Sequence, residues 1–217
     1  MSKGVYLIQQ GLAELGYDPG PLDGITGART LGALDTARAA GLAARVAAVA
    51  VPAGDDLPWM IEGRKVIGLH ETRDNAALTA WLKSDGARLG DPKALPWCGD
   101  YVETCIKRAL PLEPFTGTLA SNPYYARNWV TFGVRTDPTY GAVMVFERGP
   151  SSGHVAFAVG QDDEAFIVLG GNQGDAVGFT RIEKSRLLGA RWPKTVPGKP
   201  ISLPRMTMAQ ALSRNEA

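Results

Sequence analysis

The sequence predicts an α+β fold made of two domains, because helical patterns dominate its first half and strand patterns follow in the second. The stretch VPAGDDLP at residues 51–58 is rich in proline, glycine and aspartate, which is typical of a linker. We therefore expect a small helical domain over residues 1–52 and a larger α+β domain over residues 53–195. Residues 196–217 contain several prolines and little periodicity, which favours a flexible tail or a loosely docked arm.

The first domain is expected to hold three helices. Apolar residues recur at helical spacing in two segments: Val5, Ile8, Leu12 and Leu15 in the first, and Leu31 and Leu34 in the second. Between them, the glycines and prolines of DPGPLDGITG suit an ordered turn. The alanine-rich segment 42–51 predicts the third helix.

The second domain is expected to place helices before a sheet. Helical patterns occur at about residues 59–68 and 75–84, and a third begins at Cys98. After a loop with a short helix, apolar or alternating runs predict one antiparallel sheet with strands at about 141–147, 154–160, 165–170 and 176–182.

Cys98 stands at the first turn of an amphipathic helix. The expected buried stripe contains Tyr101, Val102, Cys105, Ile106 and Ala109, and Cys98 faces the same way. Unpaired N–H groups at a helix N-terminus stabilise a thiolate, so this position suits a nucleophile. Cys105 is expected to fill the core, since seven helical residues separate the sulfurs by roughly 10.5 Å, beyond disulfide reach.

The sequence has two histidines, and they have different surroundings. His154 begins an apolar strand, and the next predicted strand ends near Asn172. A cysteine on a helix, a histidine on a strand and a later polar residue suit a thiolate–imidazolium pair whose ring is oriented by a third side chain. His70 lies in the polar segment KVIGLHETRDN, where a solvated role is expected.

The segments PWCGDYVETC, GHVAFAVG and LGGNQGDAV, followed by SRLLGARWP, resemble the CHAP- and NlpC-type branch of papain-like cell-wall amidases and peptidases. This resemblance covers roughly residues 57–193 and implies a papain-like domain that needs no metal or cofactor. Carried over by position, Cys98 is the nucleophile, His154 the general base and then acid, and Asn172 the orienting residue. Many CHAP-type members have a carboxylate as third residue, so Gln173 and Asp175 remain alternatives. Trp97, beside the nucleophile, is expected to bind substrate.

The pattern LGYDPGPLDGITGARTLGAL resembles the three-helix peptidoglycan-binding domain. The matching positions are Ile8, Gln9, Gly16, Tyr17, Pro19, Gly20, Asp23, Gly24, Gly27 and Thr30. The pattern departs at Thr36 and Ala37, where the family usually has phenylalanine and glutamine. The resemblance implies that bacterial peptidoglycan is the partner and that the residues binding it are Gln9, Tyr17, Asp23, Gly24 and Thr30.

Composition argues against other partners. The net charge of +1 gives no long-range attraction to nucleic acid. The longest apolar run, VAAVAVPA, is far shorter than the roughly 20 residues that span a membrane. The N-terminus lacks a standard signal peptide, so we expect the protein to be made in the cytoplasm and to act on the cell wall. We also expect a monomer.

The sequence therefore predicts an endolysin-type peptidoglycan hydrolase that cleaves an amide through a Cys98 thioester. The muramoyl–alanine bond and a stem-peptide bond are both compatible substrates. A wall-binding protein without activity and an injected antibacterial amidase are alternatives. A zinc enzyme would need a set of about three ligands, which two distant histidines do not suggest. A muramidase would need two carboxylates, for which Glu71 or Glu103 are candidates without a motif.

Overall fold

The computed structural model describes residues 9, 12–13, 16–23, 25–47, 56–86, 90–197, 202–206, 208, 210–213 and 216. The chain divides into two compact units, residues 1–53 and 54–217. The division falls within the segment whose composition predicts a linker.

The N-terminal unit contains one long helix, α2, which spans Ala28–Ala47. The expected third helix at residues 42–51 is not separate over its described part, because α2 continues without a break through Gly41. A single glycine costs a helix only about 1 kcal/mol, and the surrounding alanines favour continuation. The described residues between Gln9 and Ala13 are helical, in agreement with the first predicted helix, and the remainder of that segment lies outside the description.

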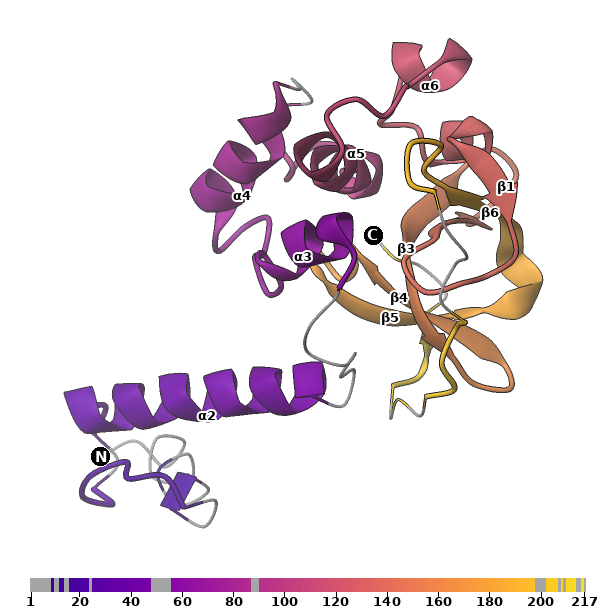
Figure 1. Ribbon diagram of the computed structural model, residues 1–217. Coiled ribbons are helices and arrows are strands. Elements are labelled where there is room, and N and C mark those ends of the chain that lie inside the picture. Colours follow the sequence, from indigo (N-terminus) through magenta and orange to yellow (C-terminus); the bar gives the residue numbers. More distant parts are fainter. Residues whose placement is uncertain are drawn as a thin grey trace. The chain divides into compact units, whose positions relative to one another are not determined.

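The second unit begins with four α-helices: α3 at Pro58–Arg64, α4 at Asn75–Leu82, α5 at Cys98–Ala109 and α6 at Gly117–Ser121. Short 3-10 helices occupy Lys83–Asp85 (η1), Ala126–Thr131 (η2) and Lys184–Arg186 (η3). Figure 1 shows α3, α4 and α5 gathered on one side of the strands, and α5 packs on β3 and β4.

A sheet of seven strands in the order β1-β6-β2-β3-β4-β5-β7 forms the rest of the unit. The strands are β1 at Val134–Thr136, β2 at Val143–Glu147, β3 at Gly153–Gln161, β4 at Ala165–Gly170, β5 at Gly178–Glu183, β6 at Leu187–Trp192 and β7 at Leu212–Ser213. The predicted α+β class and the four predicted antiparallel strands are confirmed. Strands β1 and β6, which were not predicted, extend the sheet beyond β2.

Described residues of the C-terminal segment pack on this sheet, although the sequence favours a flexible tail there. Strand β7 pairs in parallel with β5, and Ser202 and Arg205 form bridges with Thr139 and Gln161. The backbone N–H of Gly174 donates to the carbonyl oxygen of Glu216 at 3.1 Å. These contacts are mainly between backbones, so side-chain periodicity carries no sign of them.

Helix α5 is the buried centre of the unit. The expected stripe is confirmed for Tyr101, Val102, Cys105 and Ile106, which are all fully buried. The opposite side of α5 is also covered, and Thr104 donates a hydrogen bond to the Leu82 carbonyl at 3.1 Å. A nucleophile at the start of this helix is therefore held by a rigid element.

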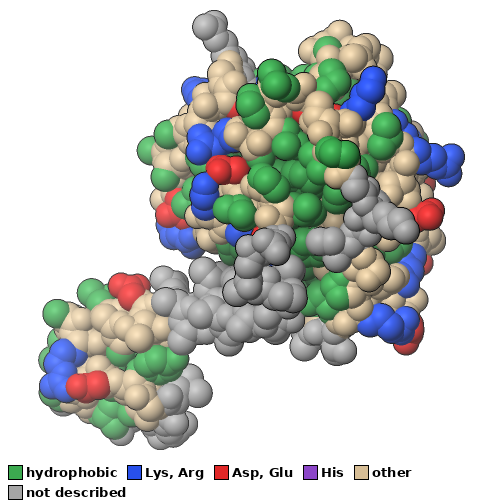
Figure 2. Space-filling model, viewed as in Figure 1, with side chains coloured by type: hydrophobic (Ala, Val, Ile, Leu, Met, Phe, Trp, Pro, Cys, Tyr) green, Lys and Arg blue, Asp and Glu red, His purple; other side chains and the backbone are tan. Residues whose placement is uncertain are grey.

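On the face of the second unit drawn in Figure 2, hydrophobic side chains gather at the centre, and charged side chains of both signs lie around it. None of the helices in the described part of the chain is long and apolar enough to cross a membrane.

Candidate active site

The N-terminus of α5 is fixed by the residues on either side of Cys98. The indole N–H of Trp97 donates to the Glu71 carboxylate at 2.8 Å, and the Trp97 side chain is fully buried. A Cβ atom at Gly99 would lie 2.4 Å from the Pro123 carbonyl oxygen, so only glycine allows this close approach. Cys98 itself is 3% exposed. Trp97, expected to bind substrate, is instead a core residue that anchors the helix.

Cys98 lies against strand β3 close to His154. The backbone N–H of Val155, the residue after His154, stabilises the Cys98 thiolate by hydrogen bonding. His154 is fully buried and lies opposite Phe146 in the register of β2 with β3. The fold thus brings Cys98 to the strand that holds His154, although the two residues are 56 positions apart in the sequence.

Gln173 contacts the His154 ring. Its side-chain Oε1 lies 3.0 Å from His154 Nε2, and its Nε2 donates to the Gly178 carbonyl at 2.5 Å. Because the amide nitrogen is committed to that carbonyl, Oε1 is the atom that faces the ring, and His154 Nε2 must carry the proton that it accepts. His154 Nδ1 is then unprotonated, and it is buried without a hydrogen-bond partner in the described structure. A basic nitrogen is left free on the ring.

The loop after β4 explains why Gln173, and not Asn172, makes this contact. Asn172, Gly174 and Asp175 all have positive φ angles, of 55°, 61° and 61°, which asparagine, glycine and aspartate tolerate best. The tight turn directs the Gln173 side chain back under Gly170 toward β3. Asn172 is buried in the turn, and among the described residues no hydrogen bond joins it to His154. In the described part of the chain, no hydrogen bond joins Asp175 to the ring either.

Burial keeps both groups neutral in the free protein. It raises the pKa of the Cys98 thiol, against smaller opposing effects of the Val155 N–H and the Arg148 charge. Burial lowers the pKa of His154 to about 4, while the Glu216 charge and the Gln173 hydrogen bond act in the opposite direction. Burial thus favours a neutral thiol and a neutral imidazole, whereas the sequence pattern suggests a thiolate–imidazolium pair.

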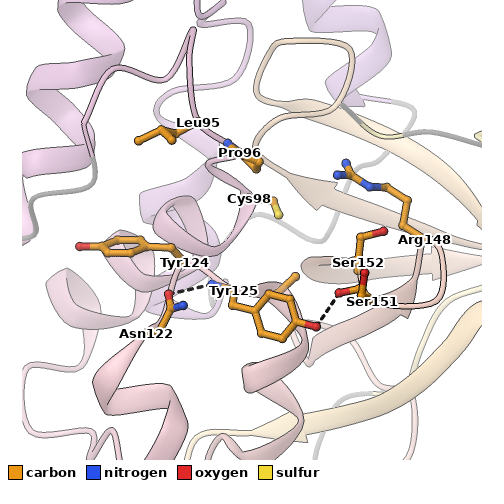
Figure 3. A pocket seen from close by; sticks show the side chains of 11 residues that line it. Leu95, Pro96, Cys98, Asn122, Tyr124, Tyr125, Arg148, Ser151 and Ser152 are labelled. Carbon is orange, nitrogen blue, oxygen red and sulfur yellow. Dashed lines mark hydrogen bonds between the residues drawn. The ribbon is translucent and has the colours of Figure 1, made fainter.

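An open cavity of about 300 Å³ reaches Cys98. Its lining includes Leu95, Pro96, Tyr124, Tyr125, Arg148 and Ser152. Figure 3 shows Cys98 between Tyr124 on one side and Arg148 on the other. The Tyr125 hydroxyl donates to the Ser151 carbonyl at 2.6 Å, which ties the η2 side of the cavity to the β2–β3 hairpin (Figure 3).

Two charged residues near the site were not among the predicted residues. Arg148 lines the cavity, and its position just before GPSSGHV is the only sequence signal for it. Glu216 is 1% exposed and makes a two-pronged ion pair with Arg186 at 2.8 and 2.9 Å. No sequence pattern indicated Glu216, because it lies in the segment that favours a flexible tail.

The remaining candidates have structural partners. His70 is half-buried, and its Nδ1 accepts a hydrogen bond from the Thr72 N–H at 3.0 Å. Glu71 accepts the hydrogen bond of the Trp97 indole, and Glu103 forms an ion pair with Lys107 at 2.5 Å. Both muramidase candidates therefore have partners within the fold. No group of three or more His, Cys, Asp or Glu side chains in the described residues is arranged to hold a metal ion.

In the N-terminal unit, two expected substrate-binding residues are internal. Gln9 is fully buried and donates to the Asp23 carboxylate at 3.1 Å and the Thr30 hydroxyl at 3.2 Å. Thr30 in turn donates to the Pro19 carbonyl at 2.9 Å. These bonds hold the turn in shape, so Gln9 and Thr30 support the fold of this unit. Tyr17 is half-buried, and Gly24 lies outside the described residues.

Comparison with known protein families detects a CHAP domain over residues 90–172. This span contains Cys98, His154 and Asn172 and ends one residue before Gln173. CHAP domains are typically cysteine- and histidine-dependent amidases or peptidases, so the match supports a hydrolase that acts on peptidoglycan. Neither a curated protein nor a solved structure matches the chain.

Proposed function

We propose that this protein hydrolyses an amide bond of peptidoglycan through a thioester on Cys98. The observation that carries the proposal is the His154 ring, which Gln173 fixes with a protonated Nε2 and a free Nδ1 beside the helix that begins with Cys98. This arrangement has the three parts that cysteine hydrolases require: a nucleophile, a base and a group that orients the base.

In the first half of the reaction, the Cys98 thiol gives its proton to His154 Nδ1 as the sulfur attacks the amide carbonyl. The transfer accompanies the attack because both groups are neutral beforehand. Backbone N–H groups at the start of α5 stabilise the developing oxyanion. The amine leaves with the proton from Nδ1, and the acyl group remains on sulfur as a thioester.

In the second half, water gives a proton to Nδ1 and attacks the thioester. The carbon–sulfur bond breaks, the acid leaves, and the sulfur recovers its proton. Throughout, the Gln173 oxygen accepts a hydrogen bond from His154 Nε2–H and so stabilises the transient imidazolium.

The N-terminal unit is proposed to bind the wall and so raise the local substrate concentration. The resemblance of residues 8–30 to peptidoglycan-binding domains supports this role. With such a module, we favour an endolysin-type enzyme. Its target is either the muramoyl–alanine bond or a stem-peptide bond.

Release of dye from labelled peptidoglycan sacculi tests the proposal. The wild type should release dye and retain its activity in a chelator. Cys98→Ala should be inactive while keeping its melting temperature. Cys105→Ala is the matched control: it should lose stability, since Cys105 is fully buried, but retain turnover in the folded fraction. Wild-type activity in Cys98→Ala would exclude the mechanism.

A further inference from the structure

We infer that Arg148 binds a free carboxylate of the peptidoglycan stem peptide and so selects acidic stem peptides over amidated ones. The inference rests on the proposed function and deepens it by assigning a substrate group to one side of the cavity.

The position of Arg148 is set by a hairpin. The residue directly follows β2, and its backbone N–H donates to the Ser152 carbonyl at 3.2 Å, closing the turn that leads into β3 and His154. The side chain lines the same cavity as Cys98, and in Figure 3 it reaches from the hairpin toward the side where Cys98 lies. Its charge acts on both Cys98 and His154, which places it within electrostatic reach of the reacting groups.

Arg148 differs from most other arginines of the second unit in its partners. Within the described residues, carboxylates pair with Arg64, Arg73, Arg108, Arg127, Arg181, Arg186 and Arg205. No carboxylate in that part of the chain pairs with Arg148, although the residue is half-buried. The neighbouring carboxylate, Glu147, is engaged by Arg127 at 3.3 Å. A partly desolvated guanidinium without an anion is unfavourable, and an anion from the substrate would satisfy it.

The charge of Arg148 also acts on both groups that exchange the proton. It disfavours the imidazolium of His154 and favours the thiolate of Cys98. A carboxylate bound by Arg148 would offset both effects, so we expect the subsite to act through the binding of the substrate.

The chemistry of peptidoglycan points to the stem peptide as the source of the carboxylate. The lactyl carboxyl of muramic acid is consumed in the amide to the peptide, whereas stem peptides retain free carboxylates. Planar guanidinium groups bind carboxylates through two parallel hydrogen bonds. Leu95, Pro96 and the two tyrosines provide apolar surface for the remainder of the peptide.

Matched muropeptides with free stem-peptide carboxylates or with the corresponding carboxamides test the inference. The full-length wild type should cleave the acid with a kcat/KM about 10- to 100-fold above that for the amide, which is the usual strength of a charged hydrogen-bonded pair. Arg148→Met should bring this ratio close to one, and Arg148→Lys should retain part of it. Arg135→Met, which removes an exposed charge from β1 outside the cavity, should keep the wild-type ratio.

Binding of the same two compounds to Cys98→Ala, measured by calorimetry, separates this inference from the proposed function. The subsite is supported if Cys98→Ala binds the acid about tenfold more tightly than the amide and Cys98→Ala/Arg148→Met loses this difference. That result would hold even if the wild type hydrolysed neither compound, in which case only the proposed function would fail. Equal affinity for acid and amide, or a preference that survives Arg148→Met, would overturn the subsite while leaving hydrolysis by Cys98 in place. Melting temperatures confirm that the variants are folded.

Discussion

At the scale of single residues, the amide side chain of Gln173 determines the tautomer of His154, the proposed base. Gln173 presents its oxygen to His154 because its amide nitrogen donates to the Gly178 carbonyl, and that oxygen can only accept a hydrogen bond. The free Nδ1 follows from that choice. Sequence reasoning assigned the orienting role to Asn172 and kept Gln173 and Asp175 as alternatives, because the side chain that reaches the ring depends on the positive φ angles at Asn172 and Asp175.

Gln173→Ala should lower kcat by about 10- to 1000-fold, because the ring loses the group that fixes its tautomer and orientation. Asn172→Ala, the matched control in the same turn, should have a smaller effect on kcat and act mainly on stability, since its left-handed backbone suits alanine poorly. Steady-state kinetics on a soluble muropeptide measures both. A larger loss of kcat in Asn172→Ala would return the orienting role to that residue.

The ionisation of Cys98 gives a second prediction. Burial raises the pKa of the thiol, so iodoacetamide should alkylate Cys98 slowly at neutral pH. The rate of alkylation should continue to increase with pH up to at least about pH 9. Peptide mass spectrometry distinguishes Cys98 from Cys105. Rapid alkylation that is constant between about pH 5 and 8 would instead reveal a stable thiolate–imidazolium pair, as the sequence pattern suggests.

At the scale of elements, helix α5 holds a cluster of buried carboxylates in addition to the nucleophile, and the burial of these groups is unfavourable to folding. Asp100, Glu103 and Asp85 lie close together and buried near its first turns, with Lys107 as their cation. One oxygen of Asp100 has no hydrogen-bond partner in the described structure. Burial and the neighbouring carboxylates raise the pKa of Asp100 to about 8.

This shift makes stability depend on pH with a definite sign. Between about pH 4 and 8, Asp100 is ionised in the unfolded chain and protonated in the fold, so the free energy of unfolding falls as pH rises. Asp100→Asn cannot ionise and should be more stable than the wild type at pH 8, by at least about 2 kcal/mol, with a smaller gain at pH 5. Thermal melts at both values measure this, with the exposed Asp137→Asn as control. A gain that does not grow with pH would contradict the assignment.

The C-terminal segment gives a prediction about the arm that replaces the expected flexible tail. Glu216→Gln leaves Arg186 without its buried anion and should destabilise the second unit by roughly 2 kcal/mol. Asp163→Asn breaks the exposed pair with Arg205 and should cost less than about 1 kcal/mol.

Urea unfolding followed by tryptophan fluorescence reports on the second unit alone, because all five tryptophans of the chain lie there. Equal stability of Glu216→Gln and wild type would mean that the arm is not bound through this pair.

The predictable elements were those with a periodic side-chain pattern. Helix α5 and strands β2 to β5 alternate or bury apolar residues at regular spacing, and their limits were predicted to within about three residues. Strand β7 and the separate bridges of Ser202 and Arg205 depend on backbone hydrogen bonds with distant partners, which no local pattern encodes. A separate third helix was expected at residues 42–51, but over the described residues α2 continues through Gly41 to Ala47.

At the scale of the whole molecule, the proposed function rests on the order of short motifs more than on overall composition. PWC, GHV and GGNQ stand at the start of α5, the start of β3 and the turn after β4. The first two motifs contribute Cys98 and Gly153 to the cavity lining, and the third contains Gln173, which contacts the His154 ring. Residues outside these motifs also reach the site. Arg148 lines the cavity and the Glu216 charge acts on His154, and finding both residues required the three-dimensional arrangement.

Mass spectrometry of purified peptidoglycan after digestion by the protein tests Cys98-dependent amide hydrolysis most directly. We expect products with new amine and carboxyl termini at one amide bond, no new reducing sugar ends, and no products from Cys98→Ala. The position of the new termini would also distinguish a muramoyl–alanine amidase from a stem-peptide peptidase. Products with new reducing ends, or the same amide products from Cys98→Ala, would contradict Cys98-dependent amide hydrolysis.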